Sequence, residues 1–358
     1  MVRPDAVVVG GGVAGCAAAI HLARRGVRVD LYEKARHPRR KACGEGLLPH
    51  GVDALAELGV EAEGPRVRGL RFVSPSGATA ECGFPFGHGR VVRRERFDAA
   101  LFRAAAATPG VRAFEGTAWT PDRGARWVVG ADGLRSQFHR RPEFPASPPS
   151  LRRTGLSTHA RGLEVDPERV EVLIHEAGEL YLAPSDGGEA LVAALYRTVP
   201  EGASAEDRLR TTLLSLDVLR GRIRGLEFTT PVLAAAPLGL RVGAVASDEI
   251  LLVGDAAGAP DPVTGEGMSL ALRCARAAAE AIVAGDPFRY ATAHRQLSSG
   301  PEWLGKWLLR ATRYPALADR VVASLSARPE LFSKLLEIAT GARRAGDLTW
   351  AETASLLV

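Results

Sequence analysis

Three closely spaced glycines and one acidic residue form the first group that could do chemistry. Gly10, Gly12 and Gly15 make a GxGxxG pattern directly after the apolar run 6–9, and they open a small-residue helix; Glu33 ends the next apolar run. The first glycine of such a pattern permits a tight turn, the second lets the backbone approach a pyrophosphate, and the third lets the helix pack close to the strand. In this setting the pattern predicts a dinucleotide site rather than a plain glycine turn.

The start of that helix and the acid select the kind of dinucleotide. The first N–H groups of a helix have no partner within it, and the positive end of the helix dipole favours phosphate there. Glu33 can accept hydrogen bonds from ribose hydroxyls, but its charge would repel a 2′-phosphate. We therefore expect FAD or NAD(H) at this site, and not NADP(H).

Two more acids follow apolar runs that are typical of buried strands. Asp132 stands in Gly-Ala-Asp-Gly, and Asp255 stands in Gly-Asp. Because α/β sheets bind ligands at the carboxyl ends of their strands, both carboxylates are expected at one edge of the sheet. Gly265 and Gly267 then open an alanine-rich helix that runs to about residue 284. Its free N–H groups would face something electron-rich.

In this order the motifs resemble the FAD-binding pattern of the class A flavoprotein monooxygenase superfamily. Its branches include the FAD-dependent aromatic hydroxylases and, more distantly, the geranylgeranyl reductases and the flavin-dependent halogenases. The resemblance implies that Asp255 binds the ribityl chain and that Asp132 lies near the pyrophosphate. It also implies that Gly267 and Met268 offer N–H groups to the N1–C2=O edge of the flavin, and that Arg94 opens a helix and reaches the cofactor. The implied cofactor-binding residues are Gly10, Gly12, Val13, Ala14, Gly15, Glu33, Lys34, Lys41, Cys43, Arg94, Ala118, Asp132, Gly133, Gly254, Asp255, Pro262, Gly265, Gly267 and Met268.

The segment 41–49 is the most individual part of the chain. It resembles the Lys-x-Cys-Gly segment of geranylgeranyl reductases and the Gly-Glu-Ser-Leu-x-Pro segment of halogenases, which lie beside the flavin. Cys43 could therefore give a proton near flavin N5, since a neighbouring cation such as Lys41 tunes a thiol. It could equally fill a glycine-rich turn as a small residue, and we favour that interpretation. Cys43 and Tyr181 are the only candidates for a catalytic role.

Several positions depart from the resembled families. The segment 178–184 lacks the tryptophans of the halogenase Trp-x-Trp-x-Ile-Pro motif, which argues against halogenation. Tyr181 keeps only one aromatic residue of the pair that the reductases carry there. Ser269 stands where hydroxylases often have Asn. Only about ten residues separate Ala118 from Trp127, so the β-meander that is usual between them is expected to be shortened.

The remaining patterns predict the elements around this site. A hairpin is expected at 67–73 and 78–84, followed by antiparallel strands, a helix at 205–219 and a returning strand at 228–236. The alternating segments that predict these strands are 156–161, 170–175, 179–183 and 190–196. We expect this sheet to form one wall of a pocket over the flavin.

From residue 286 onward the pattern is helical and carries an apolar stripe. The stripe consists of Trp303, Trp307, Leu308, Ala311, Leu317, Val321, Val322 and Leu325. It could face a membrane or a lipophilic substrate. A helical cap packed on the core is favoured, because Pro315 breaks the stripe.

The predicted fold class is α/β. A Rossmann-type FAD-binding domain, GR2-like with a shortened β-meander, carries an inserted antiparallel-sheet substrate domain and a C-terminal helical segment. The predicted boundaries are 1–66, 90–148 and 244–286 for the FAD-binding domain, 67–89 and 149–243 for the substrate domain, and 287–358 for the helical segment.

Composition narrows the class of protein further. The 358 residues are 46% hydrophobic with a net charge of +5, but only four are lysines and the arginines are scattered, which argues against a nucleic-acid partner. The four cysteines show no CxxC pair and no metal-ligand spacing, so no metal is expected. No apolar run is long enough to span a membrane, and the start of the chain lacks a signal-peptide pattern, so a cytoplasmic protein is expected.

Three functions remain open. The first choice is a monooxygenase in which NADH or NADPH reduces FAD and a flavin C4a-hydroperoxide from molecular oxygen attacks an aromatic or lipophilic biosynthetic intermediate. The second is an FAD-dependent C=C reductase like the geranylgeranyl reductases, and the third is a catalytically idle FAD-binding partner. With a single GxGxxG pattern, the nicotinamide donor is expected to bind only transiently.

Overall fold

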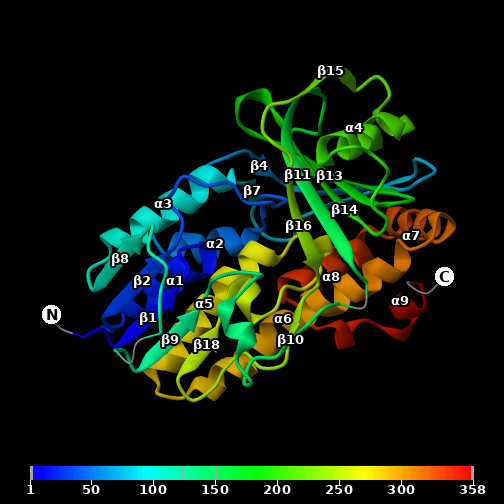
Figure 1. Ribbon diagram of the computed structural model, residues 1–358. Coiled ribbons are helices and arrows are strands. Elements are labelled where there is room, and N and C mark those ends of the chain that lie inside the picture. Colours follow the sequence, from blue (N-terminus) through cyan, green and yellow to red (C-terminus); the bar gives the residue numbers. More distant parts are fainter. Residues whose placement is uncertain (1–2, 122–123, 150, 356–358) are drawn as a thin grey trace.

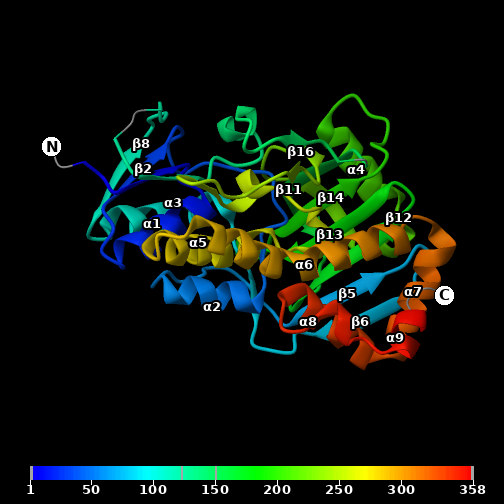
Figure 2. The same ribbon diagram turned by 90° about the horizontal axis from the view of Figure 1, so that it is seen from below.

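Two sheets joined by long helices make up the molecule (Figure 1). The computed structural model describes residues 3–121, 124–149 and 151–355. A parallel sheet lies at the N-terminal end and a large mixed sheet at the other. Helices α5 (Gly267–Val283) and α6 (Pro287–Ala311) run one after the other along the molecule past both sheets (Figure 2).

The parallel sheet confirms the predicted Rossmann-type fold. Its strand order is β18-β9-β1-β2-β8, and every pair is parallel. The central strand β1 is buried on both faces, as its run of four apolar residues requires. The five strands are β1 (Ala6–Val9), β2 (Val29–Glu33), β8 (Val111–Glu115), β9 (Trp127–Gly130) and β18 (Ile250–Leu252). Between β8 and β9 the described residues form no strand, in agreement with a shortened meander.

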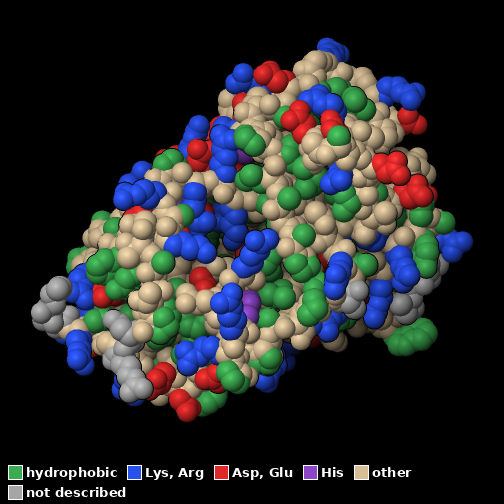
Figure 3. All heavy atoms as spheres, viewed as in Figure 1, with side chains coloured by type: hydrophobic (Ala, Val, Ile, Leu, Met, Phe, Trp, Pro, Cys, Tyr) green, Lys and Arg blue, Asp and Glu red, His purple; other side chains and the backbone are tan. Residues whose placement is uncertain are grey.

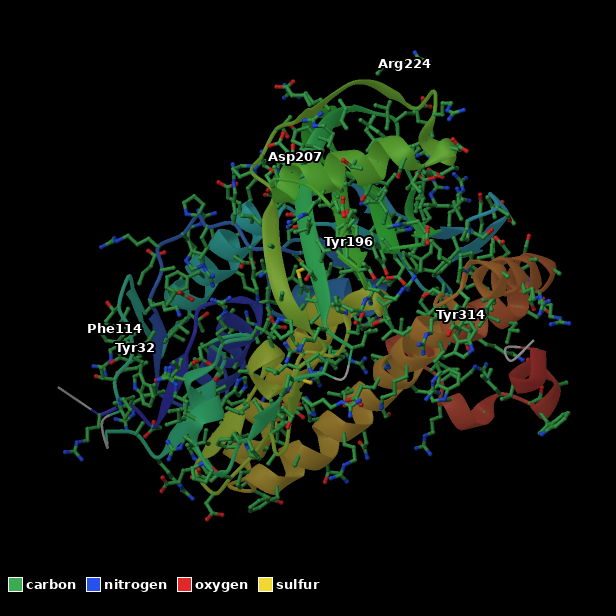
Figure 4. All side chains as sticks on the ribbon, turned by 45° about the vertical axis from the view of Figure 1, so that its right-hand side comes forward. Tyr32, Phe114, Tyr196, Asp207, Arg224 and Tyr314 are labelled. Carbon is green, nitrogen blue, oxygen red and sulfur yellow. The ribbon has the colours of Figure 1, made fainter. Side chains whose placement is uncertain are left out.

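Helices cover one face of this sheet. The alanine-rich α1 (Val13–Ala23) is buried over almost its whole length and packs against α5 and α3 (Arg94–Ala107). On the opposite face Phe138 and Phe144 pack against β1 and β18. At the edge, the rings of Tyr32 on β2 and Phe114 on β8 stack with centroids 4.7 Å apart (Figure 4).

The large sheet contains the predicted hairpin and the four predicted strands. Its order is β15-β11-β14-β13-β12-β5-β6, with β16 also paired to β11. All pairs are antiparallel except β12 with β5. The strands are β5 (Gly69–Val73), β6 (Thr79–Gly83), β11 (Arg153–Leu163), β12 (Arg169–His175), β13 (Gly178–Pro184), β14 (Ala190–Tyr196), β15 (Ile223–Phe228) and β16 (Leu233–Leu238).

Two element predictions in this region are wrong in detail. The returning strand expected at 228–236 is two strands, β15 and β16, separated by residues 229–232. Pro231 lies in the break and has no N–H to donate to a ladder. The helix expected at 205–219 ends at Ser215, because the backbone of Leu216 is extended, and a separate 3₁₀ turn follows (Asp217–Leu219). This helix, α4 (Ala205–Ser215), packs on the large sheet, where the hydroxyls of Tyr196 and Thr212 are 2.7 Å apart (Figure 4).

The C-terminal helices form the predicted cap. Besides α6 they are α7 (Pro315–Ala327), α8 (Pro329–Thr340) and α9 (Trp350–Ser355). The apolar stripe packs into one cluster with the large sheet: Leu308, Ala311, Val321, Val322 and Leu325 are buried there, and Trp303, Trp307 and Leu317 are partly buried. The stripe is therefore internal, and Pro315 begins a new helix.

The remaining elements are short. They are α2 (Pro49–Glu57), the small sheet of β3 (Gly46–Leu47), β7 (Gly89–Val91) and β4 (Arg66–Val67), and the pair β10 (Ala146–Ser147) and β17 (Arg241–Val242). Strand β10 lies within the proline- and serine-rich stretch 142–150, whose last residue, Ser150, is outside the described residues. Over the described ranges, no helix combines the length and apolar character needed to cross a membrane.

Two buried histidines predict how stability depends on pH. Burial lowers the pKa of His175 on β12 to about 4, and burial followed by the charge of Arg25 lowers the pKa of His21 on α1 to about 4. Between the ordinary value of 6.5 and about 4, the unfolded chain therefore binds more protons than the folded one. The free energy of unfolding is expected to fall as pH drops through this window. Thermal melts from pH 7 to pH 4.5 should show it, with a shallower decline in His175→Phe; equal slopes would contradict the assignment.

Candidate active site

Among the glycines of the loop after β1, only Gly12 has open space where a side chain would begin. Gly10 has φ +111°, and a Cβ there would lie 2.3 Å from the carbonyl oxygen of Ala131. A Cβ on Gly15 would lie 1.8 Å from the carbonyl oxygen of Gly10. At Gly12 a Cβ would meet only the guanidinium of Arg39, 3.8 Å away. Gly12 is also the N-cap of α1 and has no side chain to satisfy the first N–H groups of the helix, so these groups face that space.

These distances predict different outcomes for two alanine variants. Gly12→Ala should fold normally, because its methyl group meets no protein atom closely, but it should lose most bound FAD, because the methyl fills the approach to the helix N-terminus. Gly15→Ala should fail to fold stably. Flavin absorbance of the purified protein and thermal melting measure the two effects. A Gly12→Ala protein with wild-type flavin content would contradict a phosphate site here.

Glu33 holds the glycine loop in place. Its carboxylate accepts hydrogen bonds from the N–H groups of Gly11 and Ala35, both at 2.8 Å, and one oxygen lies 3.2 Å from Arg39. Lys34 is exposed beside it, and Ala118 is exposed just beyond the end of the neighbouring strand β8. The structure brings these predicted residues to one edge of the sheet. Binding of a ribose by Glu33 remains a prediction.

The two predicted aspartates lie at the ends of the adjacent strands β9 and β18. Asp132 accepts the N–H of Gln137 at 2.9 Å through one carboxylate oxygen, while the other is buried and finds no partner among the described residues. Asp255 pairs with Lys41 at 3.0 Å, and the charge of Lys41 lowers the pKa of Asp255. Each aspartate has a neighbouring glycine with positive φ: Gly133 follows Asp132, and Gly254 precedes Asp255.

A second open helix N-terminus lies at the start of α5. Pro262 begins a 3₁₀ turn that ends at Gly265 in the left-handed conformation, and α5 starts at Gly267 without a side-chain cap. A Cβ at Gly267 would find no atom within 4 Å, whereas Met268 is buried. The preceding residue, Glu266, is buried and bonded to His50 at 2.8 Å; burial raises the pKa of Glu266.

These features together fit FAD. Two uncapped helix N-termini suit the negatively charged pyrophosphate and the electron-rich edge of a flavin. The unpartnered oxygen of Asp132 and the ionised Asp255 can accept hydrogen bonds from cofactor groups. Lysine and arginine side chains gather around a hollow between the two sheets (Figure 3). That the residues predicted from the sequence hold this cofactor remains a prediction.

The cysteine loop lies where this hollow meets the large sheet. The N–H of Cys43 donates to the hydroxyl of Ser157 on β11 at 3.1 Å. The Cys43 sulfur accepts the N–H of Glu45 at 3.3 Å and interacts with the guanidinium of Arg94. The thiol is thus surrounded by two donors. A turn filler would need neither of them.

Arg94 faces the thiol and its own helix. Its guanidinium is buried and makes two hydrogen bonds of 2.8 Å to Asp98 one turn further along α3. Although burial disfavours the charge, Asp98 and then Cys43 raise the pKa of Arg94, so the cation is retained. The predicted contact of Arg94 with the cofactor remains a prediction.

A pocket opens beside the cysteine loop. From the loop and α3 it is lined by Lys41, Cys43, Glu45 and Arg94, and from the large sheet by Ser157, His159, Leu191 and Leu233. Glu45 and His159 were not predicted from the sequence. His159 Nε2 lies 2.9 Å from a carboxylate oxygen of Glu45, and both residues are buried. Their separation of 114 positions leaves no local signal.

Tyr181, the other catalytic candidate, lies elsewhere. Its hydroxyl donates to the carbonyl oxygen of Val263 at 3.0 Å, and burial raises the pKa of Tyr181. It does not line the pocket around Cys43. Tyr181 therefore ties the large sheet to the turn that precedes α5. A catalytic role for Tyr181 remains a prediction.

Comparison with known proteins supports an FAD-dependent oxidoreductase. Residues 5–46 match the family described as FAD dependent oxidoreductase. A menaquinone reductase of Mycolicibacterium smegmatis is 32% identical over 332 residues, which cover 81% of this chain and 79% of that protein. Digeranylgeranylglycerophospholipid reductase 2 of Methanothermobacter thermautotrophicus is 29% identical over 317 residues, covering 78% of this chain and 79% of that protein.

Solved structures show the same fold at lower identity. A flavin-dependent brominase superposes with a TM-score of 0.83 at 20% identity, covering 98% of this chain and 97% of the other. A geranylgeranyl bacteriochlorophyll reductase-like protein of Thermoplasma acidophilum superposes with a TM-score of 0.76 at 19% identity, covering 99% of this chain and all of the other (100%).

Proposed function

This chain belongs to the FAD-dependent oxidoreductases of the geranylgeranyl reductase-like superfamily, and from that premise we propose that it reduces a carbon–carbon double bond in a lipophilic isoprenoid compound. The observation that carries the proposal is the Cys43 thiol, held in a pocket between the N–H of Glu45 and the guanidinium of Arg94. The names of the relatives, a menaquinone reductase and a digeranylgeranylglycerophospholipid reductase, support it.

Reduction of an isolated double bond needs a hydride and a proton. FAD, when bound and reduced, supplies the hydride. Cys43 supplies the proton to the other carbon of the double bond, and its sulfur is left as a thiolate. The N–H of Glu45 donates to this sulfur, and the guanidinium of Arg94 interacts with it. These contacts hold the thiol in the pocket, where it donates the proton to the substrate carbon.

The pocket walls suit an apolar substrate on one side. Leu191, Pro231 and Leu233 come from the large sheet and its connecting segment and face the charged loop and α3 across the pocket. An isoprenoid segment would bury apolar surface against them. The charged wall, which contains Lys41 and Arg94, would face the cofactor and the Cys43 thiol. The external reductant is proposed to be NADH or NADPH, bound transiently.

The monooxygenase favoured by the sequence alone is the competing function. A monooxygenase needs no thiol proton donor such as Cys43, because oxygen activated at the flavin would oxygenate the substrate. The relatives that match over most of the chain are named reductases, and this favours C=C reduction. Hydroxylation of an aromatic or lipophilic compound therefore takes second place.

Anaerobic reoxidation tests the proposal. The purified holoenzyme is reduced with one equivalent of dithionite, and the flavin absorbance is followed after adding a polyprenyl quinone or an unsaturated prenyl lipid without oxygen. We expect the oxidised flavin spectrum to return and a product with one double bond fewer to form. A flavin that stays reduced until air is admitted, across both substrate types, would contradict the proposal and favour the monooxygenase.

A further inference from the structure

Glu45 has a backbone conformation that its residue type disfavours. Its φ is +52°, which makes it the sole non-glycine residue with positive φ in the described part of the chain. Its neighbours Gly44 and Gly46 could take such a conformation without steric cost. A residue with a side chain in this conformation persists when its surroundings require that side chain. The contacts of the Glu45 side chain therefore indicate why this conformation is kept.

The Glu45 carboxylate joins three elements at the pocket. One oxygen accepts the N–H of Arg94 at the start of α3, at 3.0 Å, and the other lies 2.9 Å from His159 Nε2 on β11. Through its backbone, Glu45 donates to the Cys43 sulfur and accepts from the N–H of Val92. The acid, the imidazole and the thiol line one pocket.

The second nitrogen of His159 is also held. Nδ1 lies 3.3 Å from the hydroxyl of Thr230, and the same hydroxyl accepts the N–H of His159 at 3.0 Å. Thr230 lies in the break between β15 and β16 that interrupts the expected strand. The ring is thus fixed between a carboxylate and a hydroxyl at the edge of the pocket.

The other charges around the pocket are already paired. From the cysteine loop come Arg40 and Lys41, from α3 come Arg93, Arg94 and Glu95, and the large sheet adds Glu189. Their partners are Glu95 for Arg40, Asp255 for Lys41, Asp98 for Arg94, and Glu189 for Arg93. None of these pairs contains a histidine. The Glu45–His159 pair is therefore the one at this pocket that joins a carboxylate to an imidazole.

We propose that Glu45 and His159 are positioning residues that act through Cys43: Glu45 keeps the thiol protonated before reaction, and His159 returns the proton that the thiol gives up. The inference rests on the proposed reduction. In each cycle a double bond gains a hydride from reduced FAD and a proton from the Cys43 S–H, which leaves a thiolate. A proton then returns to the sulfur by way of the Glu45–His159 pair, which takes up a proton from solvent in its turn. The external reductant is a reduced nicotinamide.

The two residues have opposite electrostatic effects on the thiol. The Glu45 carboxylate opposes formation of a second negative charge on Cys43, whereas a protonated His159 neutralises that carboxylate and favours the thiolate. Removing each charge should therefore move the reactivity of Cys43 in opposite directions. A purely structural role would move both in the same direction, since either change would loosen the pocket.

Alkylation of Cys43 measures this directly, without turnover. Cys43 is half-buried and the other three cysteines are buried, so iodoacetamide and peptide mass spectrometry can follow it alone in the oxidised holoenzyme. At pH 6.5 we expect about tenfold faster alkylation in Glu45→Gln, because the opposing charge is gone, and severalfold slower alkylation in His159→Gln. Glu45→Gly, which suits the backbone conformation, should match Glu45→Gln. His37→Gln, which breaks a similar histidine–glutamate pair at Glu115, should match the wild type.

Turnover gives the second readout. The multiple-turnover rate of His159→Gln should fall about tenfold or more and recover with added imidazole. The inference is overturned if both variants shift alkylation in the same direction, or if imidazole restores nothing, while the wild type still reoxidises anaerobically with substrate. Failure of the wild type to reoxidise anaerobically would instead overturn the proposed function.

Discussion

Cys43→Ala is expected to slow substrate-driven anaerobic reoxidation of reduced FAD by about 10²–10⁴-fold, the usual range for losing a positioned general acid. Cys43 accepts the N–H of Glu45 through its sulfur and interacts with the guanidinium of Arg94. Stopped-flow absorbance of the prereduced enzyme mixed with substrate gives the rate. Bound FAD should be unchanged, since alanine keeps the loop compact.

The matched control is another cysteine of the same chain. Cys82 on β6 is buried in the cluster between the large sheet and the C-terminal helices, and it does not line the pocket. Cys82→Ala should reoxidise within about threefold of the wild type. If Cys43→Ala behaves like Cys82→Ala, Cys43 is the turn filler that the sequence alone favoured, and the protonation step must be assigned to another group.

Arg153→Met is expected to have the largest effect on stability. The Arg153 side chain is fully buried at the start of β11 and bonds to Glu179 and to Asp261, which precedes the turn leading to α5. Methionine would leave both carboxylates short of a partner in the interior. Removing one member of a buried charged cluster costs about 3–5 kcal/mol. Glu179 keeps Arg197 and Thr312, so the effect should fall mainly on the segment around Asp261.

Two measurements check this expectation. Urea unfolding should show the loss of unfolding free energy, and flavin fluorescence should show earlier release of FAD on heating, because the Asp261 segment carries Pro262 and Gly265, which are predicted to bind the flavin. Arg220→Met is the control: its partner is Asp217, and both side chains are more than four fifths exposed (84% and 85%), so stability should hardly change. Equal effects of the two variants would show that the buried cluster does not stabilise the fold.

The parts predicted well from the sequence are those governed by neighbouring residues. The turn at Gly10, the packing at Gly15 and the uncapped start of α5 depend on a few adjacent positions, and a local pattern reports them. The hairpin and the four strands were predicted from local alternation of residue types for the same reason, although β14 is buried at every position. Their pairing order, including the parallel contact of β12 with β5, has no such signature.

The parts that were missed depend on distant partners. Glu45 and His159 are 114 positions apart, and Arg153 and Asp261 are 108 apart. Neither acid differs in type from the many surface acids of the chain. The break at 229–232 was missed because it depends on a distant contact. It places the Thr230 hydroxyl against His159 of β11, and the sequence does not show that these two segments lie side by side. For Cys43, the interaction with Arg94 that supports the proposed role likewise joins residues far apart in the sequence.

The mass of the product tests the central claim most directly. The holoenzyme, NADH or NADPH, and an unsaturated prenyl lipid without a quinone ring are incubated under ¹⁸O₂, and the product is analysed by mass spectrometry. A C=C reductase yields a product heavier by two hydrogen atoms, with no ¹⁸O, and yields the same product without oxygen. Incorporation of one ¹⁸O atom, with no product under anaerobic conditions, would contradict the account and identify a monooxygenase.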